Sequence, residues 1–207
     1  MPYFAPFYAR ERAGIAYDIS YSLPDLGDLL LEGFKVHIRV DHDHEDSALT
    51  RFINTAAALL QDNTRRILTT TSVVEYYDIW PWDYSAVIAC HRAPVVSITS
   101  VKYYDSDAVQ QTWGTGNYQT DLVRDGARIV VDPDATVNSP ALDDRIHPVE
   151  LTYVAGYGST VADIPAEAVN AIFTRAAYLY DVGREIGSDV DVTAVERCWQ
   201  SAITNST

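Results

Sequence analysis

The chain has 207 residues, 47% hydrophobic and 21% charged, which is typical of a globular protein that can bury a core without metals or disulfides. Its formal net charge is −14. This charge argues against direct binding to nucleic acid, because contacts to phosphate groups need clustered lysine and arginine. No apolar run has the length of a signal peptide or a membrane span, so the sequence favours neither secretion nor membrane insertion.

The first 24 residues are rich in aromatic side chains that follow neither a helical nor a strand period. Prolines and a glycine interrupt them. We predict an extended arm over residues 1–24 that covers either its own domain or a neighbouring subunit, because so many free aromatic side chains would promote aggregation. The candidate partner-binding residues of this arm are Tyr3, Phe4, Phe7 and Tyr8.

Two amphipathic helices are predicted over residues 25–37 and 43–64, where apolar residues recur at helical spacing. Asp43 is the predicted N-cap of the second helix. Glu45 and Asp46 would then lie in its first turn, where the helix dipole favours negative charge.

A β-rich block follows over residues 67–155. We predict about six short strands in it, because β-branched and aromatic runs alternate with clusters of Gly, Pro, Asn and Asp. The clearest runs cover residues 69–77, 95–104, 128–131 and 149–155.

Trp80 and Trp82 flank Pro81 inside this block. In an extended segment the two tryptophans would share one face, while the proline interrupts strand pairing. Two interpretations are open: the segment is a loop that closes the core of the block, or its tryptophans anchor a partner, since tryptophan is enriched at binding hot spots. Both tryptophans are therefore candidate interface residues.

A third helix is predicted from Pro165, which suits the first helical position, to Gly183, where it should stop. A short helix over residues 193–201 would follow, with Trp199 on its apolar side as a further candidate interface residue, before a polar tail. The sequence therefore predicts an α+β protein with two helices, a β-rich block, a helix and a short helix in chain order.

One cluster has the residue types of a metal site, and its members are His37, Asp41, His42, Asp43, His44, Glu45 and Asp46. Their spacing does not fit an EF-hand, which would need glycine where Asp46 stands and glutamate where Phe52 stands. His42 and His44 could bind zinc only with further ligands from elsewhere. A solvated, acid-capped helix start is the favoured interpretation.

Gly156-Tyr157-Gly158 lies between a predicted strand and a predicted helix, like a dinucleotide-binding turn, but Val161 stands where that pattern needs its third glycine. A glycine-assisted turn is favoured. The sequence contains no motif of a nucleophilic, phosphate-binding or zinc-dependent enzyme, and Cys90 and Cys198 lack the spacing of a metal or redox pair. We predict no enzymatic activity, no cofactor and two free thiols.

Three segments, in this order along the chain, resemble the head-tail connector proteins of tailed phages, also called head-completion or adaptor proteins and shared by gene transfer agents. The first covers residues 34–46 (FKVHIRVDHDHED) and leads into the second helix. The second, residues 92–105 (RAPVVSITSVKYYD), is similar to the strand pair of the longer family members. The third comprises residues 153–158 (YVAGYG), Ile164-Pro165 and the helix that ends in residues 180–185 (YDVGRE).

The resemblance implies a connector domain over residues 25–186, between the arm and a C-terminal tail over residues 187–207. The expected domain is a small helical bundle, from residues 25–64 and 165–183, with an inserted antiparallel β-rich region over residues 67–155.

The resemblance also implies a homo-oligomeric, twelve-fold ring beneath the portal protein. Such a ring seals the filled head and joins the tail through stopper or tail-terminator proteins, and DNA would pass through its lumen without specific binding. The expected location is the particle neck, and the bacterial host cytoplasm during assembly. A tail-completion protein of the same particle and a small metal- or nucleotide-binding enzyme are the open alternatives.

Overall fold

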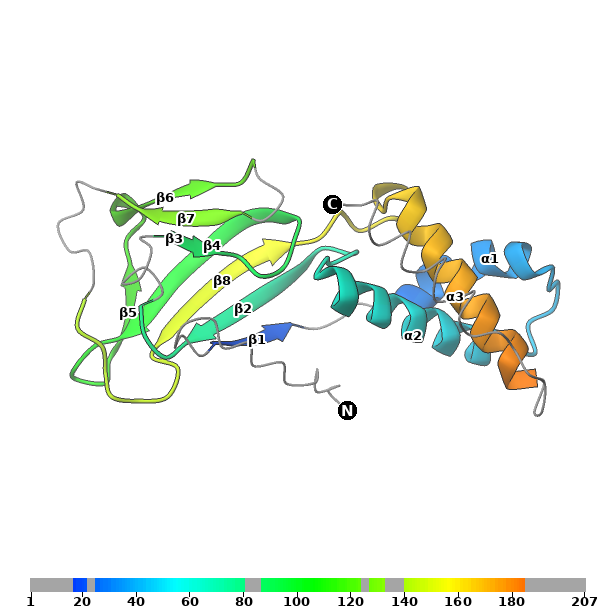
Figure 1. Ribbon diagram of the computed structural model, residues 1–207, viewed down its shortest axis with the longest axis horizontal. Helices are drawn as coiled ribbons and strands as arrows, with labels where there is room; N and C mark the ends of the chain where they lie inside the picture. Colours follow the sequence, from blue (N-terminus) through cyan, green and yellow to red (C-terminus); the bar gives the residue numbers. More distant parts are fainter. Residues whose placement is uncertain (1–16, 22–24, 81–86, 124–126, 133–139, 185–207) are drawn as a thin grey trace. The chain divides into compact units, whose positions relative to one another are not determined.

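The computed structural model describes residues 17–21, 25–80, 87–123, 127–132 and 140–184 (Figure 1). The chain divides into two compact units. Residues 1–22 and 70–156 belong to the sheet unit, and residues 23–69 and 157–207 belong to the helical unit. Among the described residues, no helix is both long and apolar enough to cross a membrane.

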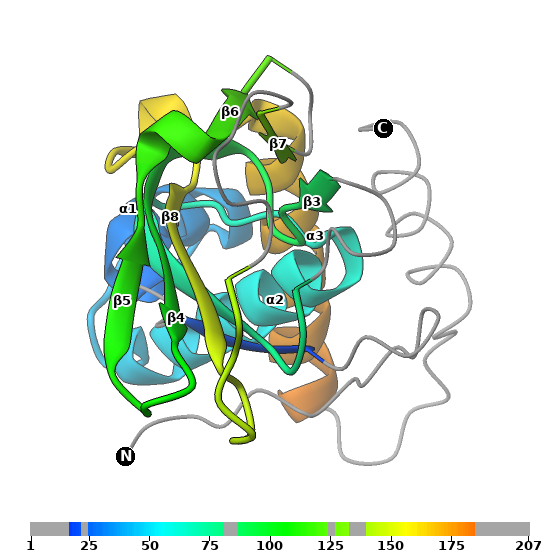
Figure 2. The same ribbon diagram turned by 90° about the vertical axis from the view of Figure 1, so that its left-hand side faces the viewer.

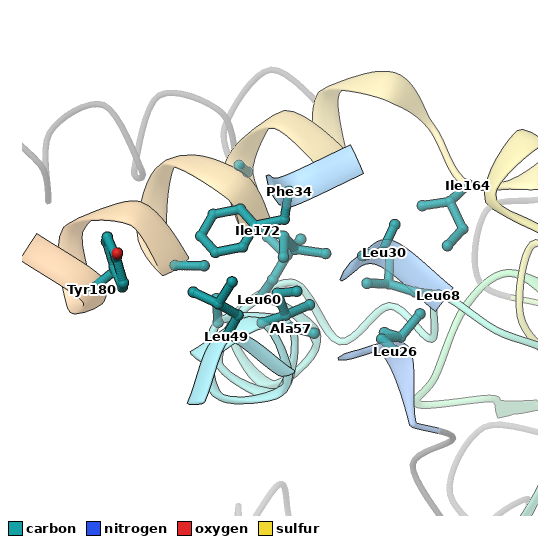
Figure 3. Packing of buried hydrophobic residues seen from close by; sticks show 14 residues of the cluster. Leu26, Leu30, Phe34, Leu49, Ala57, Leu60, Leu68, Ile164, Ile172 and Tyr180 are labelled. Atoms are coloured by element: carbon teal, nitrogen blue, oxygen red, sulfur yellow. The ribbon is translucent and has the colours of Figure 1, made fainter. Parts of the chain in front are cut away.

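The described part of the helical unit contains the helices α1 (Leu26–Ile38), α2 (Asp46–Thr64) and α3 (Ala166–Arg184), with a 3₁₀ turn, η3 (Val161–Asp163), before α3. Helix α2 packs against both α1 and α3. Their apolar stripes meet in one buried cluster (Figure 3), which includes Leu26, Leu30, Phe34, Leu49, Ala57, Leu60, Leu68, Ile164, Ile172 and Tyr180. Helical spacing in the sequence is what brings these residues to one side of each helix.

The start of α1 is held against α2 by a small hydrogen-bond network. Asp25 Oδ1 accepts hydrogen bonds from Gly27 N at 2.9 Å and from Asn54 Nδ2 at 2.8 Å. Asn54 Oδ1 accepts a second bond from Gly27 N at 2.8 Å. The two helices approach so closely that a Cβ atom at Gly27 would come within 2.8 Å of the Thr50 carbonyl oxygen.

We therefore expect Gly27→Ala to destabilise the helical unit by about 2 kcal/mol, although alanine is the better helix former, because α1 must shift away from α2. Denaturation followed by far-UV circular dichroism measures the loss. Gly116→Ala is the matched control, since a Cβ atom at Gly116 meets no other atom within 4 Å. Equal stability of the two variants would contradict the close approach of the helices.

The described residues of the sheet unit form two antiparallel sheets. The five-stranded sheet has the order β1 (Tyr17–Tyr21), β2 (Thr71–Tyr77), β8 (Val149–Ala155), β4 (Val95–Tyr104) and β5 (Gln110–Trp113). The three-stranded sheet has the order β3 (Val87–Ala89), β7 (Arg128–Val131) and β6 (Tyr118–Asp121), and a 3₁₀ turn, η2 (Thr115–Asn117), connects β5 to β6. Figure 2 shows β5, β4 and β8 side by side.

Side chains along a β-strand point alternately to the two faces of the sheet, and this alternation determines which residues of the sheet unit are buried. In β2 and β8 every second residue is buried, and the register pairs Val73 with Tyr153 and Glu75 with Leu151. Ile88 and Ile129 from the three-stranded sheet are also buried. One charged residue, Glu75, therefore takes a core position of an otherwise apolar and aromatic strand face.

The α+β class predicted from the sequence is confirmed. The expected helices over residues 25–37, 43–64 and 165–183 correspond to α1, α2 and α3, and an antiparallel region is inserted between α2 and α3. The described residues of this region hold the seven strands β2 to β8, where about six were expected. Residues 17–21 of the expected arm form β1, which pairs with β2 along its whole length.

The predicted N-cap of α2 is wrong. The helix begins at Asp46 and its N-cap residue is Glu45, which makes no side-chain capping bond. Asp43 instead accepts a hydrogen bond from Lys35 Nζ at 2.6 Å. A charged partner from α1 competes for the carboxylate, and this partner is not visible in the local pattern from which caps are predicted.

Candidate functional site

The acidic cluster before α2 is organised around a lysine of the same chain. Lys35 is buried, and its Nζ atom lies 2.6 Å from Asp43 Oδ1 and 3.0 Å from Asp46 Oδ1. The hydrogen bond to Asp43, followed by that to Asp46, raises the pKa of Lys35, and the bond from Lys35 lowers the pKa of Asp43. The ammonium group thus fills the position between two carboxylates where a bound cation would lie.

His42 and His44 lie beside this cluster. Both are exposed, and their ring centroids are 5.6 Å apart. Over the described ranges of the chain, no three His, Cys, Asp or Glu side chains are grouped as metal ligands. The exposure of both histidines is that expected of a solvated helix start, whereas the acid cap expected there is not formed.

We expect the double variant His42→Ala/His44→Ala to keep the stability of the original chain within about 1 kcal/mol, because exposed side chains outside caps and cores contribute little. Thermal denaturation with and without added zinc, together with metal analysis of the purified protein, tests this. Detection of one zinc ion per chain, lost from the double variant along with stability, would show that the histidines are ligands.

The glycine-containing turn after β8 already holds a carboxylate. Asp163 Oδ2 accepts hydrogen bonds from the Thr160 hydroxyl at 2.8 Å, from Thr160 N at 2.9 Å and from Ser159 N at 3.1 Å. These bonds, that of the Thr160 hydroxyl first, lower the pKa of Asp163. Two backbone N–H groups that could have bound a phosphate are therefore occupied by Asp163.

The geometry of this turn requires glycine at two positions, Gly156 and Gly158. Gly156 has a φ of 131°, which residues with a side chain rarely adopt, and its N–H donates to Pro94 O at 2.9 Å. A Cβ atom at Gly158 would overlap the Asp163 side chain. The turn matches the glycine-assisted strand-to-helix connection that the sequence favours.

A buried carboxylate, Glu75 in β2, is the centre of a polar cluster inside the sheet unit. Its Oε1 atom accepts hydrogen bonds from the Tyr153 hydroxyl at 2.5 Å and from His91 N at 2.8 Å. Its Oε2 atom accepts one from the Tyr77 hydroxyl at 2.5 Å and lies 2.9 Å from His91 Nδ1. Both carboxylate oxygens thus have two partners each, from β2, β8 and the segment after β3.

The directions of the pKa shifts in this cluster are those expected of a carboxylate with a structural role. Burial alone would raise the pKa of Glu75, but the hydrogen bonds from His91, Tyr153 and Tyr77 outweigh burial and hold this pKa below its ordinary value. Burial, and then the charge of Glu75, raise the pKa of the neighbouring Cys90 thiol. Cys90 is therefore held in its protonated form, whereas a nucleophilic cysteine needs a lowered pKa.

The groups around Glu75 lead us to expect that the protein loses stability at alkaline pH. Burial and the charge of Glu75 raise the pKa values of Tyr77 and Tyr153 as well as that of Cys90. For groups with a raised folded-state pKa, the contribution to stability is complete below the unfolded-state pKa and is lost as the pH rises beyond it.

We therefore expect the Tm to fall as the pH rises above 9, the ordinary pKa of the thiol. In Cys90→Ala the decline should begin nearer pH 10, the ordinary pKa of the tyrosines. Thermal denaturation from pH 8 to pH 11 measures both curves. Identical pH profiles for the two proteins would contradict the burial of the Cys90 thiol beside Glu75.

Sequence reasoning missed the Glu75 cluster, because its members lie far apart along the chain. The signal that was present is a single acidic residue at an inward position of a strand made otherwise of β-branched, aromatic and small residues, Thr71–Tyr77. Such a residue needs buried partners, of which the strand itself contains only Tyr77.

Of the predicted interface residues, Trp80 lies in the described part of the chain. It is buried in the sheet unit, and its Nε1 donates to Pro140 O at 2.8 Å. Its ring packs against Tyr103 and Trp113, with centroid distances of 5.5 and 5.7 Å. These contacts agree with a residue that closes the core of the β block.

Partner binding stays a prediction for all the candidate interface residues, including Trp80. The other six lie outside the described residues, and they are Tyr3, Phe4, Phe7, Tyr8, Trp82 and Trp199.

The combination of a helical unit and an antiparallel sheet unit is shared with chains of gene transfer agent particles. A chain in the virion of a native gene transfer agent particle is 21% identical to this one, with a TM-score of 0.70, over 88% of this chain and 93% of that chain. A chain in the neck of an empty gene transfer agent particle, computed with C6 symmetry, is 19% identical, with a TM-score of 0.68, over 89% and 94%.

A chain in the neck of the native particle, computed with C12 symmetry, is also 19% identical, with a TM-score of 0.67, over 89% of this chain and 94% of that chain. No protein-family model matches the sequence, and no curated protein matches it. The resemblance to neck proteins of phage-like particles is thus confirmed at the level of the fold.

Proposed function

We propose that this chain is a non-enzymatic structural subunit of the neck of a phage-like particle, a head-tail connector that seals the head and joins the tail. The observation that carries the proposal is the extent of the shared fold, which covers 88–89% of the chain, two of the matched structures being necks. A likeness over both units supports a common structural role more strongly than a likeness over one widespread domain would.

The polar clusters support a structural role. The charge of Lys35 is paired with Asp43 and Asp46, the turn at Thr160 is closed by Asp163, and both oxygens of Glu75 are hydrogen-bonded. Reactive groups in enzymes need an open position for the substrate next to a polarised side chain. In each of these three clusters the charged group has an ionic or hydrogen-bonding partner from this chain.

The proposed assembly is a twelve-fold ring of this chain beneath the portal protein, with stopper or tail-terminator proteins on its other side. The symmetries of the matched necks, C6 and C12, support a ring of identical subunits. With a net charge of −14 per subunit, the ring would repel phosphate groups, which suits a conduit that DNA passes without specific binding. The subunit would be present in the host cytoplasm until it joins the particle.

Complementation in vitro tests this function. Heads from a host that lacks the gene for this chain are mixed with tails, with or without the purified chain, and heads with an attached tail are counted by electron microscopy. We expect tails to join the heads when the chain is present. Equal numbers of complete particles without the chain would contradict a connector role.

A further inference from the structure

Two loops at one end of the sheet unit present exposed apolar side chains. The β4–β5 connection, residues 105–109, and the loop before β8, residues 141–147, lie at the same end of the unit in both Figure 1 and Figure 2. Val109 in the first loop is 52% exposed, and Ile146 in the second is 79% exposed. Together these two loops, residues 105–109 and 141–147, form the tip of the sheet unit.

The first loop of the tip is tied down by Asp105. Its Oδ1 atom accepts hydrogen bonds from Asp107 N at 3.1 Å and Val109 N at 3.0 Å, and its Oδ2 atom accepts one from Gln111 Nε2 at 2.8 Å. The bond from Gln111, followed by that from Val109, lowers the pKa of Asp105, so this carboxylate is charged near neutral pH. Val109 is thus presented from a hydrogen-bonded turn.

The second loop of the tip is attached to the base of the first. Asp143 N donates to Tyr104 O at 3.0 Å, and the Arg145 guanidinium lies 3.8 Å from the centre of the Tyr104 ring. His147 N donates to Asp78 Oδ1 at 3.0 Å, which fixes the residue that follows Ile146. Because both loops are held by bonds of their own, docking through the tip would cost little ordering entropy.

The charge of the tip limits what can bind it. Its residues include four carboxylates against one guanidinium, and the acidic members are Asp105, Asp107, Asp143 and Asp144. For this acidic tip a second copy of the chain, with a net charge of −14, is a less favourable partner than a basic protein, and nucleic acid would be repelled. The complementary surface is a protein with an apolar depression for Val109 and Ile146 and with lysine or arginine at its rim.

We propose that the tip is the docking surface through which this chain contacts a different, basic protein of the assembly. This inference rests on the proposed function, which supplies the assembly. It does not follow from that function, because a ring subunit could equally use this end against the next copy of itself.

Photo-cross-linking in assembled particles identifies the occupant directly. Particles are produced in a host whose own copy is replaced by the chain with Ile146→p-benzoylphenylalanine, irradiated, and digested for mass spectrometry. We expect the position to cross-link to a peptide of another particle protein that is rich in lysine or arginine. A cross-link to a peptide of this same chain, or no cross-link in particles that contain the chain, would overturn the proposal.

A pair of double variants gives a second readout. We expect Val109→Ser/Ile146→Ser to lower the amount of chain incorporated into particles by about tenfold or more, because loss of buried branched apolar side chains weakens binding at least to this degree. The matched control is Val96→Ser/Val123→Ser, which changes two exposed valines of the sheet unit outside the tip. Equal incorporation of both variants would also overturn the tip as a docking surface.

The outcomes separate this inference from the proposed function. Absence of the unmodified chain from particles would refute both. Incorporation of the unmodified chain, with the tip variant incorporated equally well, would refute only the docking surface.

A charge-reversal variant tests whether the partner is basic. We expect Asp107→Lys/Asp144→Lys to reduce incorporation more in low salt than in high salt, because exposed charges are screened as ionic strength rises. The opposite salt dependence would contradict a basic partner.

Discussion

Glu75→Gln is expected to destabilise the sheet unit by about 3 kcal/mol, because a neutral amide cannot accept the four hydrogen bonds that the carboxylate accepts. The tyrosine and histidine groups around it are then left with poorer partners in the interior. For a chain of this size, such a loss lowers the Tm by roughly 10 °C.

Thermal denaturation followed by tryptophan fluorescence measures this loss, since Trp80 and Trp113 are buried in the same unit. The matched control is Glu150→Gln, the same substitution on a half-buried position of the neighbouring strand β8. We expect the control to lose less than about 1 kcal/mol. Similar Tm values for the two variants would show that the cluster around Glu75 is not a structural centre.

Phe34→Ala is expected to destabilise the helical unit by about 4 kcal/mol, because it removes a fully buried aromatic side chain and leaves a cavity between helices. The Phe34 ring packs against Phe173 of α3 with a centroid distance of 5.6 Å, so it joins α1 to α3.

Far-UV circular dichroism during urea denaturation follows this unit, because the described α-helices all belong to it. Val36→Ala, two positions along the same helix and on its exposed side, is the control and should change stability by less than about 0.5 kcal/mol. A loss below about 1 kcal/mol for Phe34→Ala would mean that α1 is not part of the core.

The regular elements could be predicted because each buries one face, and burial leaves a period in the sequence. The stripe of Leu26, Leu30 and Phe34 predicts α1, and the alternation in residues 149–155 predicts β8. Residues 17–21 (YDISY) also alternate between apolar and polar side chains, but they are only five residues long and follow an aromatic, proline-interrupted stretch, so the sequence assigned them to the arm. They join the sheet as β1 through backbone pairing with β2, which depends on a strand more than 50 residues away.

The polar clusters could not be predicted for a related reason. Lys35 and Asp43 lie on either side of a turn, so local rules assigned Asp43 to the helix that follows it. Two of the three partners of Glu75 come from other segments of the sheet unit, and one of these, Tyr153, is 78 residues away. Charge pairing and buried hydrogen bonds are set by tertiary contacts, which composition and spacing do not record.

Cryo-electron microscopy of the neck of assembled particles tests the proposed connector role most directly. The predicted result is a ring of twelve copies of this fold directly beneath the portal, with the tip of each subunit against a different protein. Density for this chain in the tail, or purified complete particles that contain none of it, would contradict the proposal.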